Sequence, residues 1–145
     1  MSVFSPDLVN LDLYASDKTE AISQMAALVV AAGRGTDLDQ IVADVLERDA
    51  LGTPQVDGVA IPHARSKGVT KSSVFVARTN GVVFDPEEDP ADVLMMILVP
   101  DGDTNEHIEI LSGLARRLMN PDFTASLRTS TDATELASLL ANGEG

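Results

Sequence analysis

The chain has 145 residues, no cysteine and a formal net charge of −13 at pH 7. A chain of this length can bury a full core without metals or disulfides, so we expect a single domain over residues 1–145. The acidity argues against nucleic-acid binding, because that affinity comes largely from Lys and Arg neutralising phosphates, and the lack of cysteine excludes disulfides, thiolate metal sites and cysteine nucleophiles.

The sequence offers no candidate membrane segment. Residues 1–6 lack the basic stretch and apolar core of a signal peptide. The longest apolar run, residues 93–99, is far shorter than the roughly 18 residues that span a bilayer. We therefore expect a soluble, cytoplasmic protein that is not embedded in a membrane.

The first third of the chain predicts one strand and two helices. Apolar and polar residues alternate over residues 9–13, which is typical of a half-buried strand. An amphipathic helix is predicted to begin at Asp17 and to stop at Gly33, since apolar residues recur at spacings of three and four between them. A second helix is predicted to begin at the N-cap Thr36 and to end near Gly52.

After a loop over residues 53–57, the middle of the chain predicts strands. These are Val59–Ile61, Ser72–Arg78, Val82–Phe84 and Val93–Val99. The pair Asn80-Gly81 predicts a tight turn that joins the second and third of these strands as a hairpin. The last strand is apolar without alternation, so we expect it to be central and covered on both faces.

Three more helices are predicted toward the end of the chain. The first follows a loop over residues 100–104 and carries His107 in its first turn. The others begin at Pro121 and near Asp132. The expected fold class is α/β, with a mixed β-sheet flanked by helices on both faces, because the hairpin prevents an all-parallel sheet.

The most informative stretch is Gly58–Arg65, which reads Gly-Val-Ala-Ile-Pro-His-Ala-Arg. Pro62 has a fixed φ and is predicted to end the strand, so His63 is expected on a stiff backbone where the chain leaves the core. Arg65, Lys67 and Lys71 follow, and they offer counter-charge to an anion arriving at His63.

The residue types alone leave several interpretations open. His107 at a helix N-terminus is expected to be neutral and near groups that bind anions, but a single His is more often a surface or capping residue. Arg48, in the last turn of the second helix, equally suits a cation at a helix C-terminus. No His pair has metal-ligand spacing and no nucleotide-binding glycine loop is present, so we expect neither a metal nor a cofactor.

Three segments together resemble a known family. They are Glu47–Gly52 (Glu-Arg-Asp-Ala-Leu-Gly), Asp57–Arg65 and Asn105–Leu111 (Asn-Glu-His-Ile-Glu-Ile-Leu). They are similar to the enzyme IIA domains of the fructose/mannitol branch (type 2) of the bacterial phosphoenolpyruvate-dependent sugar phosphotransferase system. The resemblance spans nearly the whole chain, and its most specific part is the Ile-Pro-His core.

The resemblance implies a phosphocarrier. His63 is expected to accept a phosphoryl group from phospho-HPr and to pass it to a IIB domain of a sugar permease, while His107 and Arg48 stabilise the phosphorylated form. We expect the two imidazoles to lie close together, with that of His63 open to solvent. A hydroxyl at Thr53 is available to donate to the phosphate, and Arg65 is assigned more weakly to docking.

The chain departs from the family pattern in the loop before the motif. Pro54 and Val56 occupy positions where the family usually has glycine, so the loop is expected to run differently. A regulatory, nitrogen-type relative that controls partner proteins by binding is the alternative function, and a two-His hydrolase or metal enzyme is a third. Neither the transported sugar nor the oligomeric state follows from the sequence.

Overall fold

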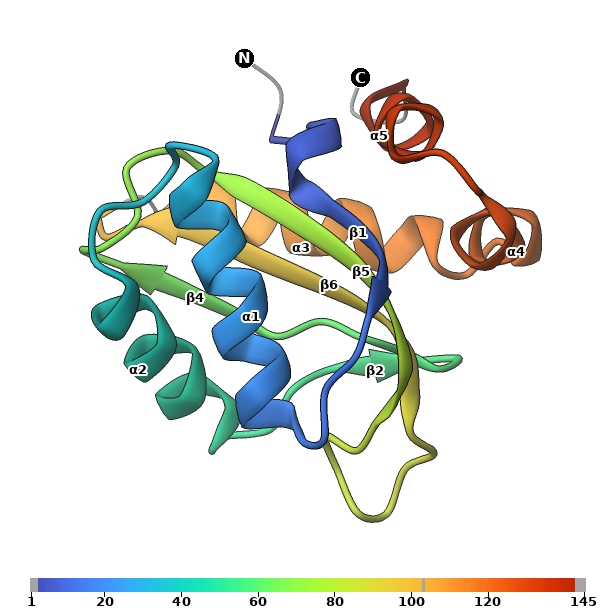
Figure 1. Ribbon diagram of the computed structural model, residues 1–145, viewed down its shortest axis with the longest axis horizontal. Coiled ribbons are helices and arrows are strands. Elements are labelled where there is room, and N and C mark those ends of the chain that lie inside the picture. The colour runs from blue at the N-terminus through green and yellow to red at the C-terminus, as the bar shows by residue number, and fades with distance from the viewer. Residues whose placement is uncertain (1–2, 103, 143–145) are drawn as a thin grey trace.

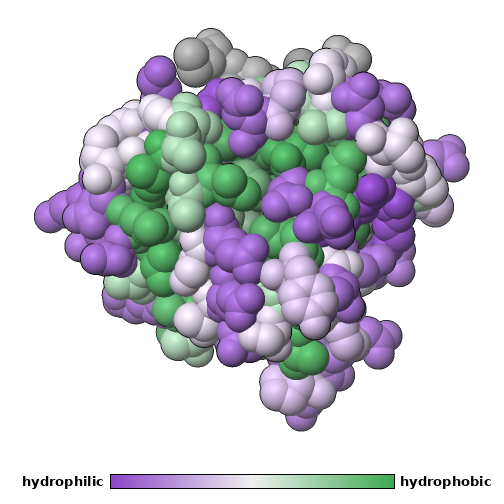
Figure 2. All heavy atoms as spheres, in the orientation of Figure 1, coloured by the Kyte–Doolittle hydropathy of each residue, from purple (hydrophilic) through white to green (hydrophobic). Residues whose placement is uncertain are grey.

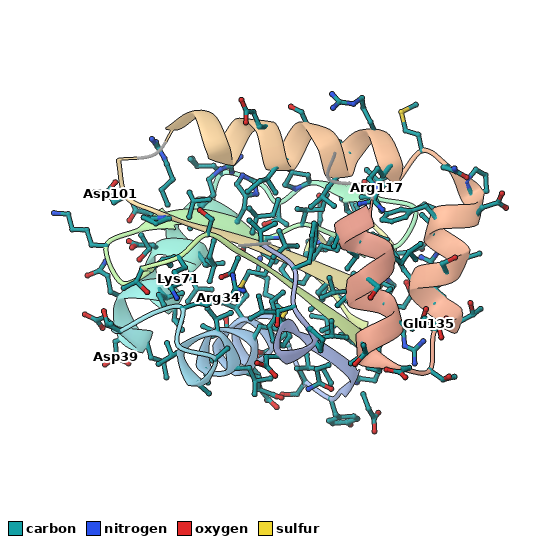
Figure 3. All side chains as sticks on the ribbon, turned by 90° about the horizontal axis from the view of Figure 1, so that it is seen from above. Arg34, Asp39, Lys71, Asp101, Arg117 and Glu135 are labelled. Carbon is teal, nitrogen blue, oxygen red and sulfur yellow. The ribbon has the colours of Figure 1, made fainter. Side chains whose placement is uncertain are left out.

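A six-stranded mixed sheet lies between two layers of helices (Figures 1 and 3). The computed structural model describes residues 3–102 and 104–142, with the backbone alone at 104–108 and 142. The elements are η1 (Pro6–Leu8), β1 (Val9–Leu13), α1 (Lys18–Ala31), α2 (Leu38–Asp49), β2 (Gln55–Val56), β3 (Val59–Ala60), β4 (His63–Ser66), β5 (Ser73–Val82), β6 (Ala91–Pro100), α3 (Thr104–Arg117), α4 (Pro121–Thr129) and α5 (Ala133–Asn142). The α/β fold class is therefore confirmed.

Strand β6 is the centre of the sheet, as its unbroken apolar sequence predicts. Alternate residues point to opposite faces, so one strand supplies two cores. Leu94, Met96 and Leu98 pack into a cluster with α1 and α2. Residues 93, 95, 97 and 99 pack into a second cluster with α3, α4 and α5. Helices thus cover both faces, α1 and α2 on one and α3 to α5 on the other (Figure 3).

The strand order is β1-β5-β6-β3-β2, and β4 pairs with β6 beyond β3. Both β3 and β4 run parallel to β6, with His63 opposite Ile97. Strand β3 ends before Pro62, as predicted, but the expectation that the chain leaves the core at His63 is wrong. Proline has no N–H to give, but the carbonyl of Pro62 accepts from the N–H of Ile97 at 3.0 Å, so the chain keeps its place beside β6. His63 therefore begins a second strand within the sheet.

The predicted hairpin at Asn80-Gly81 is also wrong. Strand β5 runs through this pair without turning back, and its antiparallel partner is β6. The register between the two strands shifts between Arg78 and Val82, and Gly81 has φ of +98°. The left-handed conformation of Gly81 therefore allows the register shift within β5 and does not form a turn. The antiparallel β5–β6 pair makes the sheet mixed.

Helix ends mostly follow their capping residues. Asp17 caps α1 as predicted, with its carboxylate accepting from the N–H of Glu20. The N-cap of α2 is Asp37 and not Thr36, because the Asp37 carboxylate accepts from the N–H of Gln40. The backbone N–H of Thr36 instead donates to the carbonyl of Gly68, which holds Thr36 outside the helix.

The remaining helices match their predicted starts within a residue or two. Helix α4 begins at Pro121 with Asn120 as its N-cap, and α5 begins at Ala133. None of the helices in the described part of the chain has the length and apolar character needed to cross a bilayer.

The face formed by α1 and α2 mixes apolar and polar residues (Figure 2). Helix α1 is apolar around most of its circumference, and Leu28 on its outer side is 38% exposed. Most of its buried side chains nevertheless point at the sheet, where Ile22, Met25 and Val29 are fully covered.

Truncating the centre of the sheet should cost much more stability than truncating a surface residue of the same type. Leu98 on β6 is fully buried, whereas Leu51 is 82% exposed. We expect Leu98→Ala to lower the free energy of unfolding by about 2–5 kcal/mol, because it removes apolar burial and leaves a cavity. Leu51→Ala should change it by less than about 0.5 kcal/mol. Urea unfolding followed by circular dichroism measures both, and equal losses would contradict the assigned core.

Candidate functional site

His63 is the first residue of β4, and its side chain points to the face of the sheet that α3 covers. The next residue, Ala64, packs with α1 and α2 on the opposite face. Side chains alternate along a strand, so His63 lies on the α3 side together with its register partner Ile97. The sheet therefore holds the imidazole on a backbone bonded to the central strand.

The ring of His63 is held in one orientation by a backbone carbonyl. Its Nδ1 lies 2.9 Å from the carbonyl oxygen of Ile61. A carbonyl oxygen accepts and does not donate, so Nδ1 carries the proton in the neutral ring. The lone pair of the neutral imidazole is consequently on Nε2.

His63 is only 3% exposed. The expectation of an imidazole open to solvent is therefore wrong for this conformation. The residue lies beside β6 on the α3 side of the sheet, where apolar neighbours such as Ile61 and Ile97 are also covered. Little of the residue is open to a reaction partner in this conformation.

The burial has an electrostatic consequence. Removal of the ring from water lowers the pKa of His63 from its ordinary value of 6.5, the hydrogen bond to the Ile61 carbonyl opposes this, and the positive charge of Arg48 lowers the pKa further. His63 is therefore neutral at pH 7. A neutral imidazole with its lone pair on Nε2 is a nucleophile.

Arg48 lies in the last turn of α2, as the sequence predicts, and it is half-buried. Its Nη1 donates to the carbonyl of Gly52 at 2.9 Å. Its positive charge also lowers the pKa of His63, as the smallest of the three influences on that ring. Arg48 and His63, two of the residues that the sequence singles out, are thus coupled electrostatically.

Thr53 has a different partner from the one expected. Its hydroxyl donates to Oδ1 of Asp49 at 2.5 Å, so its single proton is used within the protein. Asp49 also forms an ion pair with Lys18 of α1, with 2.7 Å between Oδ2 and Nζ. Neither Asp49 nor Lys18 is singled out by the sequence, because their partners are distant in sequence or lie in a loop.

The loop before His63 takes left-handed backbone at other positions than the two where the family usually has glycine. Left-handed backbone occurs at Gly52 (φ +105°), Asp57 (φ +51°) and Gly58 (φ +80°), and not at Pro54 or Val56. Within the predicted loop, Gln55–Val56 form β2, which pairs antiparallel with β3. The left-handed residues of this loop therefore lie on either side of β2.

The basic residues after His63 lie at the surface. Arg65, Lys67 and Lys71 are exposed. By strand alternation Arg65 shares the face of His63, about 7 Å further along β4. Lys71 lies at the same end of the molecule as Arg34 and Asp101 (Figure 3). Arg65 is thus positioned to meet a partner that approaches this face.

His107 is the fourth residue of α3, in the first turn as predicted. The position of its side chain lies outside the described residues, so its expected proximity to His63 stays a prediction. Helix α3 does cover the face to which His63 points. Among the described side chains, no group of three or more His, Asp or Glu residues is placed to hold a metal ion.

The chain as a whole is similar to proteins of a known family. A family model described as "Phosphoenolpyruvate-dependent sugar phosphotransferase system, EIIA 2" matches residues 2–143. The chain is similar to the fructose-specific EIIA component of the phosphotransferase system of Haloferax volcanii, with 37% identity over 97% of this chain and 94% of the relative.

Solved structures agree with this match. The nitrogen regulatory protein IIA-Ntr of Neisseria meningitidis superposes with a TM-score of 0.85 and 28% identity, over 95% of this chain and 96% of that one. The complex of enzyme IIA-Mtl with phosphorylated enzyme IIB-Mtl from Escherichia coli gives a TM-score of 0.78 and 27% identity, over 95% and 96% of the two chains.

The pKa of His63 is directly measurable. We expect NMR titration to place it below 6.5, and Arg48→Gln to raise it, because the variant removes a positive charge that disfavours a protonated ring. Arg65→Gln is the matched control and should leave the value unchanged. An unchanged pKa in Arg48→Gln would contradict the assigned interaction.

The lowered pKa of His63 also makes the stability of the fold depend on pH. Since the unfolded chain has the higher pKa, the free energy of unfolding should fall as the pH drops from about 6.5 through the folded-state pKa.

Proposed function

This chain belongs to the EIIA 2 family of the phosphoenolpyruvate-dependent sugar phosphotransferase system, and we propose that it is a phosphocarrier whose His63 accepts and donates a phosphoryl group. The donor is phospho-HPr and the acceptor a IIB domain. The observation that carries the assignment to His63 is the Nδ1 contact with Ile61, because it leaves the lone pair on Nε2 of a neutral ring.

In the proposed reaction, Nε2 of His63 attacks the phosphorus of the donor. The new N–P bond forms as the bond between phosphorus and the donor imidazole breaks, and the donor leaves as a neutral ring. The proton on Nδ1 of His63 stays in place throughout. The phosphorylated ring gains positive character, which strengthens its hydrogen bond to the Ile61 carbonyl.

Arg48 favours the product by the same charge that adds to the effect of burial in keeping the ring neutral. Its guanidinium disfavours a proton on His63, whereas it attracts the negative oxygens of a phosphoryl group bonded to Nε2. One cation therefore selects a phosphoryl group over a proton. No metal or cofactor is needed in this scheme. Arg48 and the backbone N–H groups at the start of α3 are proposed to balance the negative charge of the transferred phosphoryl group.

We assign supporting roles to the other predicted residues. His107, at the N-terminal end of α3, stabilises the phosphoryl group together with the backbone N–H groups of that turn. Arg65 contributes to docking, as its exposed position on the His63 face supports. Thr53 acts on the site through the loop it anchors, since its hydroxyl is bonded to Asp49.

The burial of His63 sets a condition on this function. With 3% of the residue exposed, little of His63 is open to the donor imidazole in the described conformation. Acceptance of the phosphoryl group therefore includes a local opening step, driven by docking of the donor. The cost of such an opening is moderate when it moves side chains and leaves the sheet intact.

The sugar-transport role is the first candidate, and its support is the similarity to a fructose-specific EIIA component. A IIB partner is supported by the Escherichia coli complex, in which the similar protein is bound to phosphorylated IIB. In this role residues 1–145 form one cytoplasmic domain that works beside a membrane permease. The regulatory role is the second candidate, and the similarity to IIA-Ntr of Neisseria meningitidis favours it.

Phosphorylation should depend on His63. Incubation with phosphoenolpyruvate, enzyme I and HPr is expected to add one acid-labile phosphoryl group, and His63→Ala should abolish it because no lone pair remains at the acceptor position. Mass spectrometry at neutral pH measures the added group. Retention of the group by a folded His63→Ala protein would refute the acceptor assignment.

Onward transfer distinguishes the two roles. We expect the phosphorylated chain, mixed with a fructose-type IIB domain, to lose its phosphoryl group to that domain within the dead time of manual mixing. A stable phosphorylated chain that no fructose-type or mannitol-type IIB domain discharges would favour the regulatory role. Wild-type chain incubated without IIB controls for spontaneous hydrolysis.

A further inference from the structure

Asp49 is an almost buried carboxylate that joins three separate parts of the chain. Its side chain is 7% exposed, and its Oδ2 lies 2.7 Å from Nζ of Lys18 in α1. Its Oδ1 accepts from the hydroxyl of Thr53 at 2.5 Å. Burying a carboxylate destabilises the folded state unless the charge is paired and hydrogen-bonded. The burial of Asp49 therefore depends on both Lys18 and Thr53.

A chain of hydrogen bonds runs from this carboxylate to the imidazole of His63. Thr53 is followed by Pro54, whose carbonyl accepts from the N–H of Ile61 at 2.9 Å. The carbonyl of Ile61 in turn accepts from Nδ1 of His63. Each bond fixes the group that makes the next one. The orientation of the ring thus depends on where residues 53 and 54 lie.

Asp49 also fixes the segment that Arg48 holds. The backbone N–H groups of Leu51 and Gly52 donate to carbonyls of the last turn of α2, and Arg48 donates to the carbonyl of Gly52. Leu51 itself is 82% exposed, so apolar packing does little to hold this segment. The bond from Thr53 to Asp49 extends the side-chain anchoring of the segment by one residue toward Pro54.

Lys18 balances the negative charge of Asp49 near the proposed phosphoryl-transfer site. It neutralises Asp49 with an ion pair, and its Nζ also donates to the carbonyl of Phe84 at 3.2 Å. A lone negative charge near the site would oppose a phosphoryl dianion, whereas a neutral pair opposes it much less. The acceptor oxygen that Thr53 needs is thereby supplied without net charge.

We propose that Asp49 is a positioning residue of the phosphoryl-transfer site, which holds Thr53 and, through Pro54 and Ile61, sets the orientation of His63. The inference rests on the proposed function, because it assigns to Asp49 a part in the same transfer. A role confined to stability would instead lower the unfolding temperature and leave the folded protein fully active. The rate of transfer and the hydrogen bond at Nδ1 separate the two roles.

The test compares four variants of the full chain. Asp49→Ala removes the acceptor for Thr53, Asp49→Asn keeps an oxygen in that position, and Thr53→Val removes the donor while leaving the pair of Asp49 with Lys18. The matched control is Asp44→Ala on the same helix, because the Asp44 carboxylate bonds Gln40 on its own helix and not the loop. Thermal unfolding followed by circular dichroism reports whether each variant folds.

Two readouts are taken on the folded proteins. Under single-turnover conditions with phospho-HPr, Asp49→Ala and Thr53→Val should lower the maximal rate of phosphoryl acceptance about 10- to 100-fold, with little change in the donor concentration needed for half the maximal rate. Asp49→Asn should keep most of the rate, and Asp44→Ala all of it. In NMR spectra, the Nδ1 proton of His63 should exchange with water faster in Asp49→Ala and Thr53→Val than in the wild type.

Each outcome is decisive. Folded Asp49→Ala and Thr53→Val proteins that accept the phosphoryl group at the wild-type rate overturn the positioning role while the proposed function stands. An equal loss in Asp44→Ala overturns it as well, since charge on α2 would then explain the effect. If Asp49→Ala does not fold, Thr53→Val decides. If the wild type accepts no phosphoryl group, the proposed function fails, and exchange of the Nδ1 proton still tests the link to His63.

Discussion

The hydrogen bond between Nδ1 of His63 and the carbonyl of Ile61 is the contact on which the chemistry of this site depends. It joins the two residues that flank Pro62 in the sequence. Because proline limits the backbone at its own position and at the one before it, donor and acceptor are presented to each other by a stiff segment. The tautomer of the ring, and with it the reactive nitrogen, follows from backbone geometry.

Burial and charge act on the same ring in one direction. Loss of water and the nearby Arg48 cation both lower the pKa of His63, although Arg48 is drawn from the helical layer on the opposite side of the sheet. A site that holds a neutral imidazole beside a fixed cation is prepared for an anion. The electrostatic arrangement of the phosphorylated state is therefore present before any phosphate arrives.

Much of this arrangement follows from the sequence, and the exceptions have identifiable causes. The central strand β6, the helices capped by Asp17 and Asn120 and the motif around His63 carry strong local signals. Strand β4 is not predicted because a proline suggests an end, whereas the carbonyl of Pro62 still accepts from β6 and lets the chain continue beside it. The turn at Asn80-Gly81 was wrong because tertiary pairing with β6 overrides a local preference. No local sequence pattern points to the carboxylate of Asp49, since its role depends on a lysine 31 positions earlier in the chain.

Strand β4 is short, and in the described sheet it pairs with β6 alone. An outer strand of this kind exposes unpaired backbone groups to which another chain can add, which is a common origin of aggregation. Helix α2 packs along β4 and shields that border. The helix that supplies the arginine for the reaction thus also protects the sheet from unwanted strand addition, so loosening its end would threaten solubility as well as activity.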